Sequence, residues 1–457
     1  MLKRLRLNGV GLLPNKELVF GERFNVFTGD NGLGKTFLMD VIWYALTRRW
    51  PWEVNPQLMC GYMAQPGAGV EDPSISFGLV PVGGRSVKSY TSVFKKRQQA
   101  WVGKAGRPYS SGLVIYAQVD GGFSVWDPAR NYWFKRNGLD VQDREAAFAF
   151  SPREVWEGQY KFDERPGSGK TRCLLRGLLD DWLLWQTNPG SVEFPVLVEL
   201  LRQISPPEYE IAIGRPTKVS LDDVREMPTV RMPYGDIPVR WTSSAIHRVL
   251  SLAYILVWAF SEHVKAARFL QAAPTSQVTL LFDELDAHLH PKWQRKVMKA
   301  LVASVEKMIQ SFGRGDGARC DVQIMTTTHS PLVMAALEDD FDSMRDKWFD
   351  FDFGPDYRTV LVEDRPFERR GAADGWLKSR AFDLSSTRSP ESERILREAA
   401  AVLGSYTDRP VRKQEVVEPT PSDVVNAYLR LCEVLSSTDA FLTRYRSVCA
   451  MYGWSLP

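Results

Sequence analysis

The sequence has few of the residues that would indicate an extracellular or a metal-bound protein. Its 457 residues include five cysteines and five histidines. No two cysteines form a C-x-x-C pair, which excludes a zinc ribbon and a disulfide scaffold and suits a reducing cytosol. The 58 basic and 55 acidic residues leave a net charge of +3, so overall charge does not indicate nucleic-acid binding.

A long hydrophobic run is also lacking. The best candidate, residues 249–260, is bounded by charged residues and is shorter than the ~18 residues that cross a bilayer. Residues 1–7 alternate apolar and basic side chains and contain no secretory core. We therefore expect a cytoplasmic protein with no membrane partner.

One glycine-rich segment gives the strongest positive signal. Residues 29–36 satisfy the G-x-x-x-x-G-K-[ST] pattern of a phosphate-binding loop, with an apolar strand before them and a helical pattern after them. In that setting backbone N–H groups converge on the β-phosphate, Lys35 reaches the β- and γ-phosphates, and Thr36 ligates Mg²⁺. The predicted ATP-binding residues are Gly29, Asp30, Asn31, Gly32, Leu33, Gly34, Lys35 and Thr36.

Two further apolar strands end in polar residues that complete such a site. The strand at 278–282 runs into Asp283 and Glu284, and the strand at 322–327 is followed by His329. Asp283 is predicted to join the Mg²⁺ shell, Glu284 to orient or deprotonate the attacking water, and His329 to contact the γ-phosphate. The predicted catalytic residues are thus Glu284, His329 and Lys35, and the predicted metal ligands are Thr36 and Asp283.

These segments resemble the Walker A, Walker B and switch-histidine motifs of ABC-type ATPases. The subgroup that they resemble contains SMC-like chromosome proteins, OLD-family nucleases and ATPase subunits of bacterial defence systems. The resemblance covers residues 1–48 and 240–335. It implies an ATPase whose cofactors are ATP and Mg²⁺.

The resemblance also implies a signature loop that reaches across a head-to-head dimer to the partner's ATP. The candidate loop is 241–252, in which Ser243 takes the place of the key serine and Ser244 follows it. Thr242, Ala245 and Ile246 depart from the family pattern. We therefore expect slow hydrolysis, with ATP acting mainly as a structural clamp.

The predicted fold class is α/β: an ABC-ATPase head with a mixed αβ sheet, an antiparallel β subdomain, a helical insert and a helical C-terminal region. Residues 2–8 and 24–28 are expected to begin one sheet, 74–133 to form an antiparallel sheet, and 172–187 to be a helix. The predicted domains are 1–165 (N-terminal ATPase lobe), 166–240 (insert), 241–345 (C-terminal ATPase lobe) and 346–457 (partner-docking helical region).

Two segments outside the ATPase motifs carry weaker signals. Residues 95–104, with Arg107 beyond, form a basic hairpin tip in which Trp101 offers a stacking surface for a DNA or RNA base. A solvated loop explains this segment equally well. Residues 166–171 resemble the end of another phosphate loop, but Glu164 stands where its first glycine belongs, so we interpret them as a flexible turn.

Residues 374–384 and 388–391 are similar to C-terminal segments of the ATPase component of Septu-like anti-phage systems, in which the ATPase partners an HNH-type nuclease. The segment, which contains Trp376, suits a docking surface or a loop packed over the head. OLD-type nucleases carry a Toprim domain, which needs a glutamate and a later D-x-D at strand ends. Residues 360–364 resemble its opening strand, but no D-x-D follows them. Intrinsic nuclease activity is therefore disfavoured. The D-x-D at residues 350–352 lies before that strand, which is the wrong order for a Toprim domain, and is interpreted as a solvated strand face.

The remaining histidines are given structural interpretations. His288 and His290 belong to a Leu-His-Pro turn of the family rather than to a metal site. His247 and His263 are interpreted as helix-surface residues.

The favoured function is an ABC-type ATPase that self-associates through ATP, as a dimer or higher oligomer, and regulates an effector, most simply an anti-phage nuclease. The alternative is an SMC-like DNA-binding ATPase of repair or recombination without a toxic partner. The absence of heptad repeats in residues 49–240 favours the first. A transporter subunit is disfavoured by the Leu-His-Pro turn and the basic β-insert.

Overall fold

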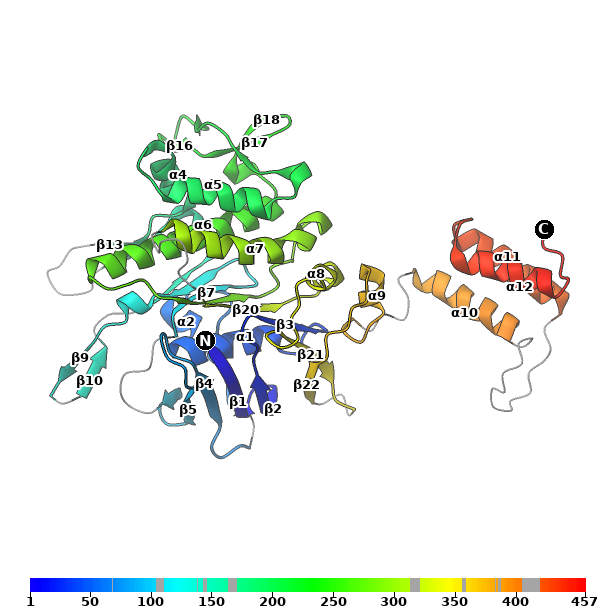
Figure 1. The fold of residues 1–457 in the computed structure, drawn as a ribbon, viewed down its shortest axis with the longest axis horizontal. Coiled ribbons are helices and arrows are strands. Elements are labelled where there is room, and N and C mark those ends of the chain that lie inside the picture. The colour runs from blue at the N-terminus through cyan, green and yellow to red at the C-terminus, as the bar shows by residue number, and fades with distance from the viewer. Residues whose placement is uncertain are drawn as a thin grey trace. The chain divides into compact units, whose positions relative to one another are not determined.

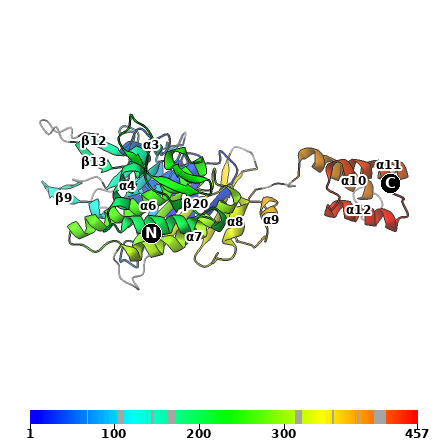
Figure 2. The ribbon, with the colours of Figure 1, turned by 90° about the horizontal axis from the view of Figure 1, so that it is seen from above.

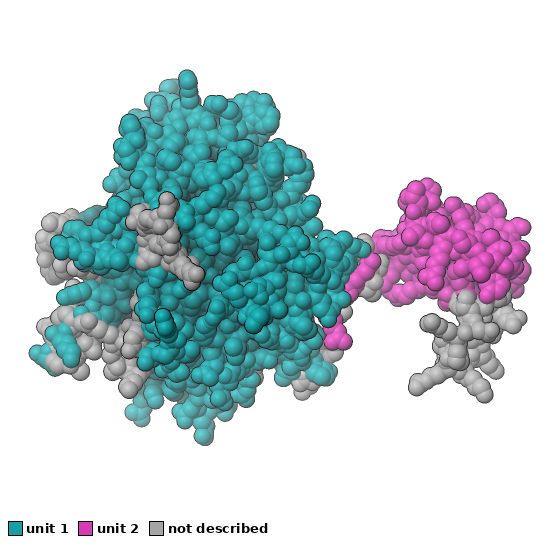
Figure 3. Space-filling model, in the orientation of Figure 1, with its two compact units in different colours: residues 1–376 teal, residues 377–457 magenta. Residues whose placement is uncertain are grey.

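The computed structural model describes residues 1–67, 69–103, 111–137, 139–142, 146–162, 171–312, 321–355, 359–382, 384, 388–404 and 420–457. The chain divides into two compact units, residues 1–376 and 377–457 (Figure 3). Each unit has a hydrophobic core of its own. Lys104 and Arg107 of the basic hairpin, and all but Thr171 of the predicted turn at 166–171, lie outside the described residues.

An eight-stranded mixed sheet forms the centre of the first unit (Figure 1). The strand order is β11-β8-β7-β19-β20-β3-β21-β22, and neighbours from β7 to β21 are parallel. The inner strands are continuous apolar runs because both of their faces are covered. The bounds are β3 Phe24–Gly29, β7 Leu113–Ala117, β8 Phe123–Trp126, β11 Ala147–Phe150, β19 Gln277–Phe282, β20 Asp321–Thr327, β21 Lys347–Phe353 and β22 Val360–Arg365.

A five-stranded antiparallel sheet, in the order β2-β1-β4-β5-β6, forms a second layer. Helix α1 (Lys35–Thr47) contributes to one buried core together with residues of both sheets (Figure 1). The bounds of this sheet are β1 Leu2–Val10, β2 Leu13–Val19, β4 Ser74–Leu79, β5 Lys88–Lys95 and β6 Ala100–Gly103.

Two sheet predictions are wrong in the same way. Residues 2–8 and 24–28 do not share a sheet, since β1 pairs with β2 and β4 whereas β3 pairs with β20 and β21. The predicted antiparallel sheet at 74–133 is divided, because β4–β6 join the second layer and β7 and β8 join the central sheet. Burial alternates along β1, as is typical of a strand in a sheet with one solvated face. Strands β3 and β7 are buried throughout, as is typical of a sheet covered on both faces.

Two long helices, α6 (Ser244–Phe269) and α7 (Pro291–Ser311), cover the other face of the central sheet (Figure 1). Helices α4 (Leu178–Thr187) and α5 (Glu193–Ile204) lie beyond them (Figures 1 and 2). Within the described chain, α6 alone has the length and composition of a membrane span, and 78% of its apolar 18-residue window is buried inside the fold. It is the core helix of this unit. Shorter helices are α2 Pro51–Val54, α3 Pro152–Glu157, α8 Pro331–Leu337 and α9 Ala373–Leu377.

The insert begins with a hairpin that the helical pattern did not predict. Residues 171–175 form a strand, and the helix expected from 172 begins only at Leu178. Gly177 separates the two with φ +93°, where a Cβ would lie 2.4 Å from the backbone nitrogen of Gly158. The hairpin β9 Trp133–Arg136 and β10 Leu139–Gln142 comes earlier in the chain. The elements from 159 to 238 are β12 Gln159–Phe162, β13 Thr171–Leu175, α4 Leu178–Thr187, α5 Glu193–Ile204, β14 Ala212–Ile213, β15 Thr217–Lys218, β16 Glu226–Met227, β17 Thr229–Met232 and β18 Gly235–Pro238.

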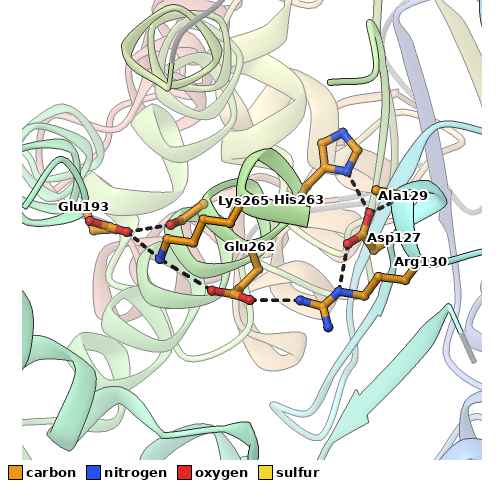
Figure 4. Close-up of polar contacts among 8 residues, drawn as sticks. Asp127, Ala129, Arg130, Glu193, Glu262, His263 and Lys265 are labelled. Carbon is orange, nitrogen blue, oxygen red and sulfur yellow. Dashed lines mark hydrogen bonds and ion pairs between the residues drawn. The ribbon is translucent and has the colours of Figure 1, made fainter. Parts of the chain in front are cut away.

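His263 ties the second half of α6 to the end of β8, so its interpretation as a surface residue is wrong (Figure 4). Its Nε2 accepts from the Thr275 N–H at 2.9 Å, and its Nδ1 therefore donates to Asp127 Oδ1 at 2.7 Å. Arg130 extends the network by pairing with Asp127 at 3.1 Å and with Glu262 at 2.9 Å. A buried imidazole fits here because both of its nitrogens are hydrogen-bonded.

Residues after 345 add strands to the central sheet and bury Asp350, which was interpreted as solvated, and Trp376, for which a docking surface and a loop packed over the head were both left open. Asp350 lies 3% exposed and accepts from the Thr28 hydroxyl at 2.9 Å, so the interpretation of 350–352 as a solvated face holds only for Asp352. Trp376 is fully buried, and its Nε1 donates to Glu338. The indole of Trp376 is therefore part of the core and not of a docking surface.

The basic hairpin between β5 and β6 is formed as predicted, but its aromatic residue points inward. Trp101 is 7% exposed and donates from Nε1 to the Ala64 carbonyl at 2.8 Å. Lys95, Lys96 and Arg97 are exposed. The predicted stacking on Trp101 is therefore wrong, and the exposed side chains of the described tip, residues 95–99, are basic or amide groups.

The second unit is helical, as predicted for the end of the chain. A capping box at Thr420 starts its second helix, and Arg388 pairs with Asp439 at 2.8 Å. Tyr428, Leu431 and Tyr445 lie in its core. The helices are α10 Pro390–Gly404, α11 Pro421–Val434 and α12 Ala440–Met451.

Candidate functional site

The phosphate-loop pattern lies between β3 and α1, where its glycines are required by the backbone. Gly29, Gly32 and Gly34 have φ of +126°, +79° and +87°. A Cβ on Gly29 would lie 2.2 Å from the Phe351 carbonyl oxygen of the neighbouring strand β21. Larger residues would therefore clash or be strained here. Asp30, Asn31 and Gly32 are exposed, and Leu33 is buried.

Lys35 is 5% exposed and folds back over the loop. Its Nζ donates to the carbonyls of Gly29 at 2.8 Å and Asp30 at 2.7 Å. Burial lowers the pKa of Lys35, against the attraction of Glu284 and Asp283. The ammonium thus lies within the field of both carboxylates, at the place where a phosphate-binding lysine is needed.

Asp283 lies at the end of β19 and is fully buried. Its Oδ1 accepts from the Thr327 hydroxyl at 2.7 Å, whereas Oδ2 has no hydrogen-bond partner among the described residues. Burial raises the pKa of Asp283, and the hydroxyls of Thr327 and Thr36 oppose that rise. A free carboxylate oxygen beside the Thr36 hydroxyl is the hard oxygen pair that Mg²⁺ prefers, so these residues fit the cation.

Glu284 and His329 face each other at the same edge. Glu284 Oε1 lies 3.5 Å from His329 Nε2, and each side chain is 31% exposed. The histidine lowers the pKa of Glu284, whose backbone N–H donates to the Thr327 hydroxyl at 2.8 Å. Glu284 has φ +49°, a conformation that costs a residue with a side chain about 1–3 kcal/mol and concentrates at functional sites.

The structure therefore brings Lys35, Thr36, Asp283, Glu284 and His329 to one edge of the central sheet and leaves the predicted signature serines apart. Ser243 is exposed and caps α6, with its hydroxyl accepting from the Ile246 N–H at 3.4 Å. Ser244 is also exposed. Among the described residues, no hydrogen bond or ion pair joins either serine to that edge.

Three residues at this edge were missed by sequence reasoning. Asp350, on the neighbouring strand β21, accepts a hydrogen bond from Thr28, the residue just before the phosphate loop. Arg248 donates from Nη2 to the carbonyls of Asp283 and Glu284 at 3.2 and 3.0 Å, and burial lowers its pKa. Gln118 is a buried amide at the end of β7. The rule that identified Asp283, a polar residue after an apolar strand, also applies to Gln118, but no sequence signal points to Arg248.

Two family models match the chain on either side of the insert. The one described as "AAA domain" matches residues 4–100, and the one described as "AAA domain, putative AbiEii toxin, Type IV TA system" matches residues 250–335. The first contains the phosphate loop, and the second contains Asp283, Glu284 and His329. The chain carries an AAA-family ATPase domain. The predicted family, α/β fold class and enzyme class are thereby confirmed.

A curated protein is also similar to this ATPase. It is the "Retron Vc95 probable ATPase" of Vibrio cholerae serotype O1 biovar El Tor, 23% identical over 212 residues. The similar region is 45% of this chain and 35% of that protein, so the chain spans about a third of the length of the relative.

Solved SMC head structures align with 80% of this ATPase chain. The "Crystal structure of the SmcHead bound to the C-winged helix domain of ScpA" is 13% identical, is covered over 98% of its chain and has a TM-score of 0.39. The "SMC head domain from Thermotoga maritima" is 13% identical, is covered over 99% of its chain and has a TM-score of 0.34. A Pyrococcus furiosus Smc head with an extended coiled coil, bound to the C-terminal domain of ScpA, is 11% identical, is covered over 96% of its chain and has a TM-score of 0.38. The identification rests on the family models and not on these likenesses.

Proposed function

We propose that the chain binds Mg·ATP at the edge formed by Lys35, Thr36, Asp283, Glu284 and His329, hydrolyses it slowly, and uses the bound nucleotide to assemble with a second copy. The convergence of these side chains from the ends of two parallel strands, β19 and β20, and from the loop and helix that follow a third, β3, supports the proposal. Thr36 and Asp283 would hold Mg²⁺, which neutralises phosphate charge when bound. Catalysis of this kind is mainly positioning and charge stabilisation.

The chain's own residues have distinct roles in this proposal. Lys35 binds the β- and γ-phosphates, with the loop N–H groups at the start of α1 around it. Glu284 orients the attacking water and accepts its proton, and His329 keeps that carboxylate ionised through its effect on the pKa. Ser243, exposed at the N-terminus of α6, would reach the γ-phosphate of the other copy.

Assembly around ATP is tested by sedimentation of the Glu284→Gln variant, which retains nucleotide. We expect a dimer or higher oligomer with Mg·ATP and a monomer with Mg·ADP, because only the triphosphate has the γ-phosphate that Ser243 would contact. A matched exposed substitution, Glu306→Gln, should leave the ATP dependence unchanged. Identical sedimentation in both nucleotides would contradict the proposed clamp.

We further propose that the ATPase regulates an effector, with a nuclease in anti-phage defence as the favoured partner. The likeness to a retron ATPase supports a defence role, and a cytoplasmic setting fits the free thiols of Cys60, Cys173, Cys432 and Cys449. Purification of the tagged full-length chain from its native source should recover a small nuclease. Recovery of DNA alone would favour the alternative, a DNA-binding ATPase of repair or recombination, which the exposed Lys95, Lys96 and Arg97 support.

The second unit is the proposed docking region for that effector, within the predicted C-terminal region 346–457. It has its own core and exposes Met451 (83%) and Tyr452 (47%). Deleting residues 377–457 should therefore abolish effector binding and keep ATP hydrolysis, because residues 1–376 form a separate compact unit. Retention of the effector by the shortened chain would place docking elsewhere.

A further inference from the structure

The turn after β19 carries Glu284, and its backbone is one that must be held in place. Glu284 and His288 have φ of +49° and +65°, both in the left-handed region. Inside the turn, the Leu289 N–H donates to the Asp286 carbonyl at 3.1 Å. Left-handed residues with side chains persist only where their surroundings hold them. The contacts that hold this turn therefore decide where the Glu284 carboxylate lies.

Gln294, in the first turn of α7, holds this turn through its side-chain amide. Its Nε2 donates to the Asp286 carbonyl at 3.2 Å and to the Leu289 carbonyl at 3.0 Å, and the side chain is half-buried. A backbone carbonyl can only accept hydrogen bonds, so the nitrogen of the amide must face these two groups. The Oε1 of Gln294 is thereby left to accept from a different donor.

That donor is Ser330, the residue directly after His329. The Ser330 hydroxyl donates to Gln294 Oε1 at 2.8 Å. The same hydroxyl oxygen accepts from the N–H groups of Leu332 and Val333 at 3.2 and 3.3 Å and so caps helix α8. The donor and acceptor capacity of this hydroxyl is thus used in fixed directions. The backbone at His329 is therefore held from the same amide that holds the turn of Glu284.

The two turns are joined on both sides of the Glu284–His329 contact, in which Oε1 and Nε2 lie 3.5 Å apart. On the strand side, the Thr327 hydroxyl accepts from the Glu284 N–H at 2.8 Å. On the far side, Gln294 makes the link through Asp286 and Ser330. A contact that is tied on both sides keeps its distance, whereas one that is tied on the strand side alone leaves the far end of each turn able to shift.

We propose that Gln294 is a positioning residue for ATP hydrolysis, which fixes the Glu284 carboxylate relative to His329 by bonding to the turns that carry them. This inference rests on the proposed function, in which Glu284 orients the attacking water. Gln294 acts through those turns and touches neither nucleotide nor water. A displacement of about 1 Å at a reacting group can cost on the order of 10²-fold in rate. The loss of this amide therefore lowers the rate of hydrolysis and leaves nucleotide binding at the phosphate loop intact.

The first test separates rate from affinity in the full-length chain. Gln294→Met keeps the length of the side chain, adds no charge and removes all three hydrogen bonds. Single-turnover hydrolysis should fall at least tenfold, and Mg·ATP affinity by isothermal titration should stay within about twofold of the parent. Gln310→Met, at an exposed position of the same helix, should match the parent in both. An unchanged rate in Gln294→Met, or a loss of affinity as large as the loss of rate, overturns the proposal.

Variants of Ser330 reach the same link from the other turn and keep the test decisive if Gln294→Met lowers the unfolding temperature. Ser330→Thr retains a hydroxyl and should hydrolyse ATP at the parental rate. Ser330→Ala removes the hydroxyl and should lower the rate about tenfold. Because both changes break one link, the double variant Gln294→Met/Ser330→Ala should lose no more than the more impaired single variant. Losses that multiply in the double variant overturn the proposal.

The Glu284→Gln chain distinguishes failure of this inference from failure of the proposed function. If Gln294 acts by placing Glu284, adding Gln294→Met to Glu284→Gln should cause no further loss of hydrolysis. A further tenfold loss in that background overturns the positioning role. Parental hydrolysis in Glu284→Gln itself contradicts the proposed function. Impaired hydrolysis in Glu284→Gln beside a parental rate in Gln294→Met overturns the role of Gln294 alone.

Discussion

The two parts of the predicted ATP site differ in how complete they are within one chain. At the edge of the central sheet, Asp283 is fully buried, Lys35 is bonded to its own loop, and Glu284 and His329 already face each other. At the N-terminus of α6, Ser243 is exposed, and among the described residues its hydroxyl is bonded within its own helix turn. The sheet edge is preorganised by a core, whereas Ser243 is the part that a second copy would complete in the proposed assembly.

A preorganised part and an open part should respond differently to substitution. Changes at the sheet edge should remove chemistry or nucleotide affinity from a single chain. Changes at the start of α6 should affect assembly and leave the single chain intact.

The largest effect is expected from Glu284→Gln. Because the amide cannot accept the proton of water, single-turnover hydrolysis should fall by about 10²–10³-fold while Mg·ATP affinity is retained. The measurement is phosphate release with enzyme in excess, with Glu306→Gln as the exposed control. Hydrolysis equal to that of the parent would remove Glu284 from the mechanism and, with it, the claim that this edge is preorganised for catalysis.

Lys35→Ala should lower Mg·ATP affinity by about 100-fold, or ~2.7 kcal/mol, because a buried ammonium beside the phosphates is lost. Isothermal titration with Mg·ATP checks this, and the exposed Lys292→Ala should match the parent. The loss should appear at protein concentrations at which the chain is monomeric. If it appears only in the assembled state, the sheet edge is not a complete binding site on its own.

Ser243→Asp should weaken ATP-dependent assembly by about tenfold without lowering the stability of the single chain. Aspartate keeps the helix cap, but its charge repels the γ-phosphate of the other copy. Sedimentation with Mg·ATP and thermal unfolding without nucleotide measure the two effects. Ser243→Ala, which also loses the cap, should cost about 1 kcal/mol of stability. Unchanged assembly in the aspartate variant would remove Ser243 from the composite site.

The smallest effect concerns Asp181, which is 5% exposed behind α6 and accepts from the Tyr254 hydroxyl at 2.7 Å. Burial raises its pKa from 3.8 to about 6. Between these values the folded state holds the proton that the unfolded state has lost, so stability falls as pH rises through this window and stays lower above it.

Asp181→Asn keeps an acceptor for Tyr254 and removes the charge. The variant should gain about 1 kcal/mol at pH 7.5 and lack the fall between pH 4 and 6. Urea unfolding at pH 4.5 and 7.5 measures both, and hydrolysis should not change, since Asp181 is remote from the sheet edge. A parallel pH dependence in parent and variant would show that Asp181 is not the group responsible.

Much of the fold that positions the site follows from local pattern. The strands ending at Gly29, Phe282 and Thr327 were predicted within a residue or two, because each is an apolar run that must be covered on both faces. Helix α6 likewise begins at a local signal, since the Ser243 side chain caps it. Predictions failed where strand pairing decides. β3 pairs with the distant β20 and not with β1, and residues 171–175 pair with 159–162 in a hairpin in place of the expected helix.

The sequence by itself determined that this chain has a phosphate loop and acidic strand ends, since such loops require glycines at fixed positions and a lysine after them. Only the tertiary structure decided which polar residues are buried. Asp350, His263 and Trp376 lie in the core because residues far along the chain supply their hydrogen bonds. Burial of a polar group depends on a partner, and sequence spacing does not reveal a partner that only folding brings near.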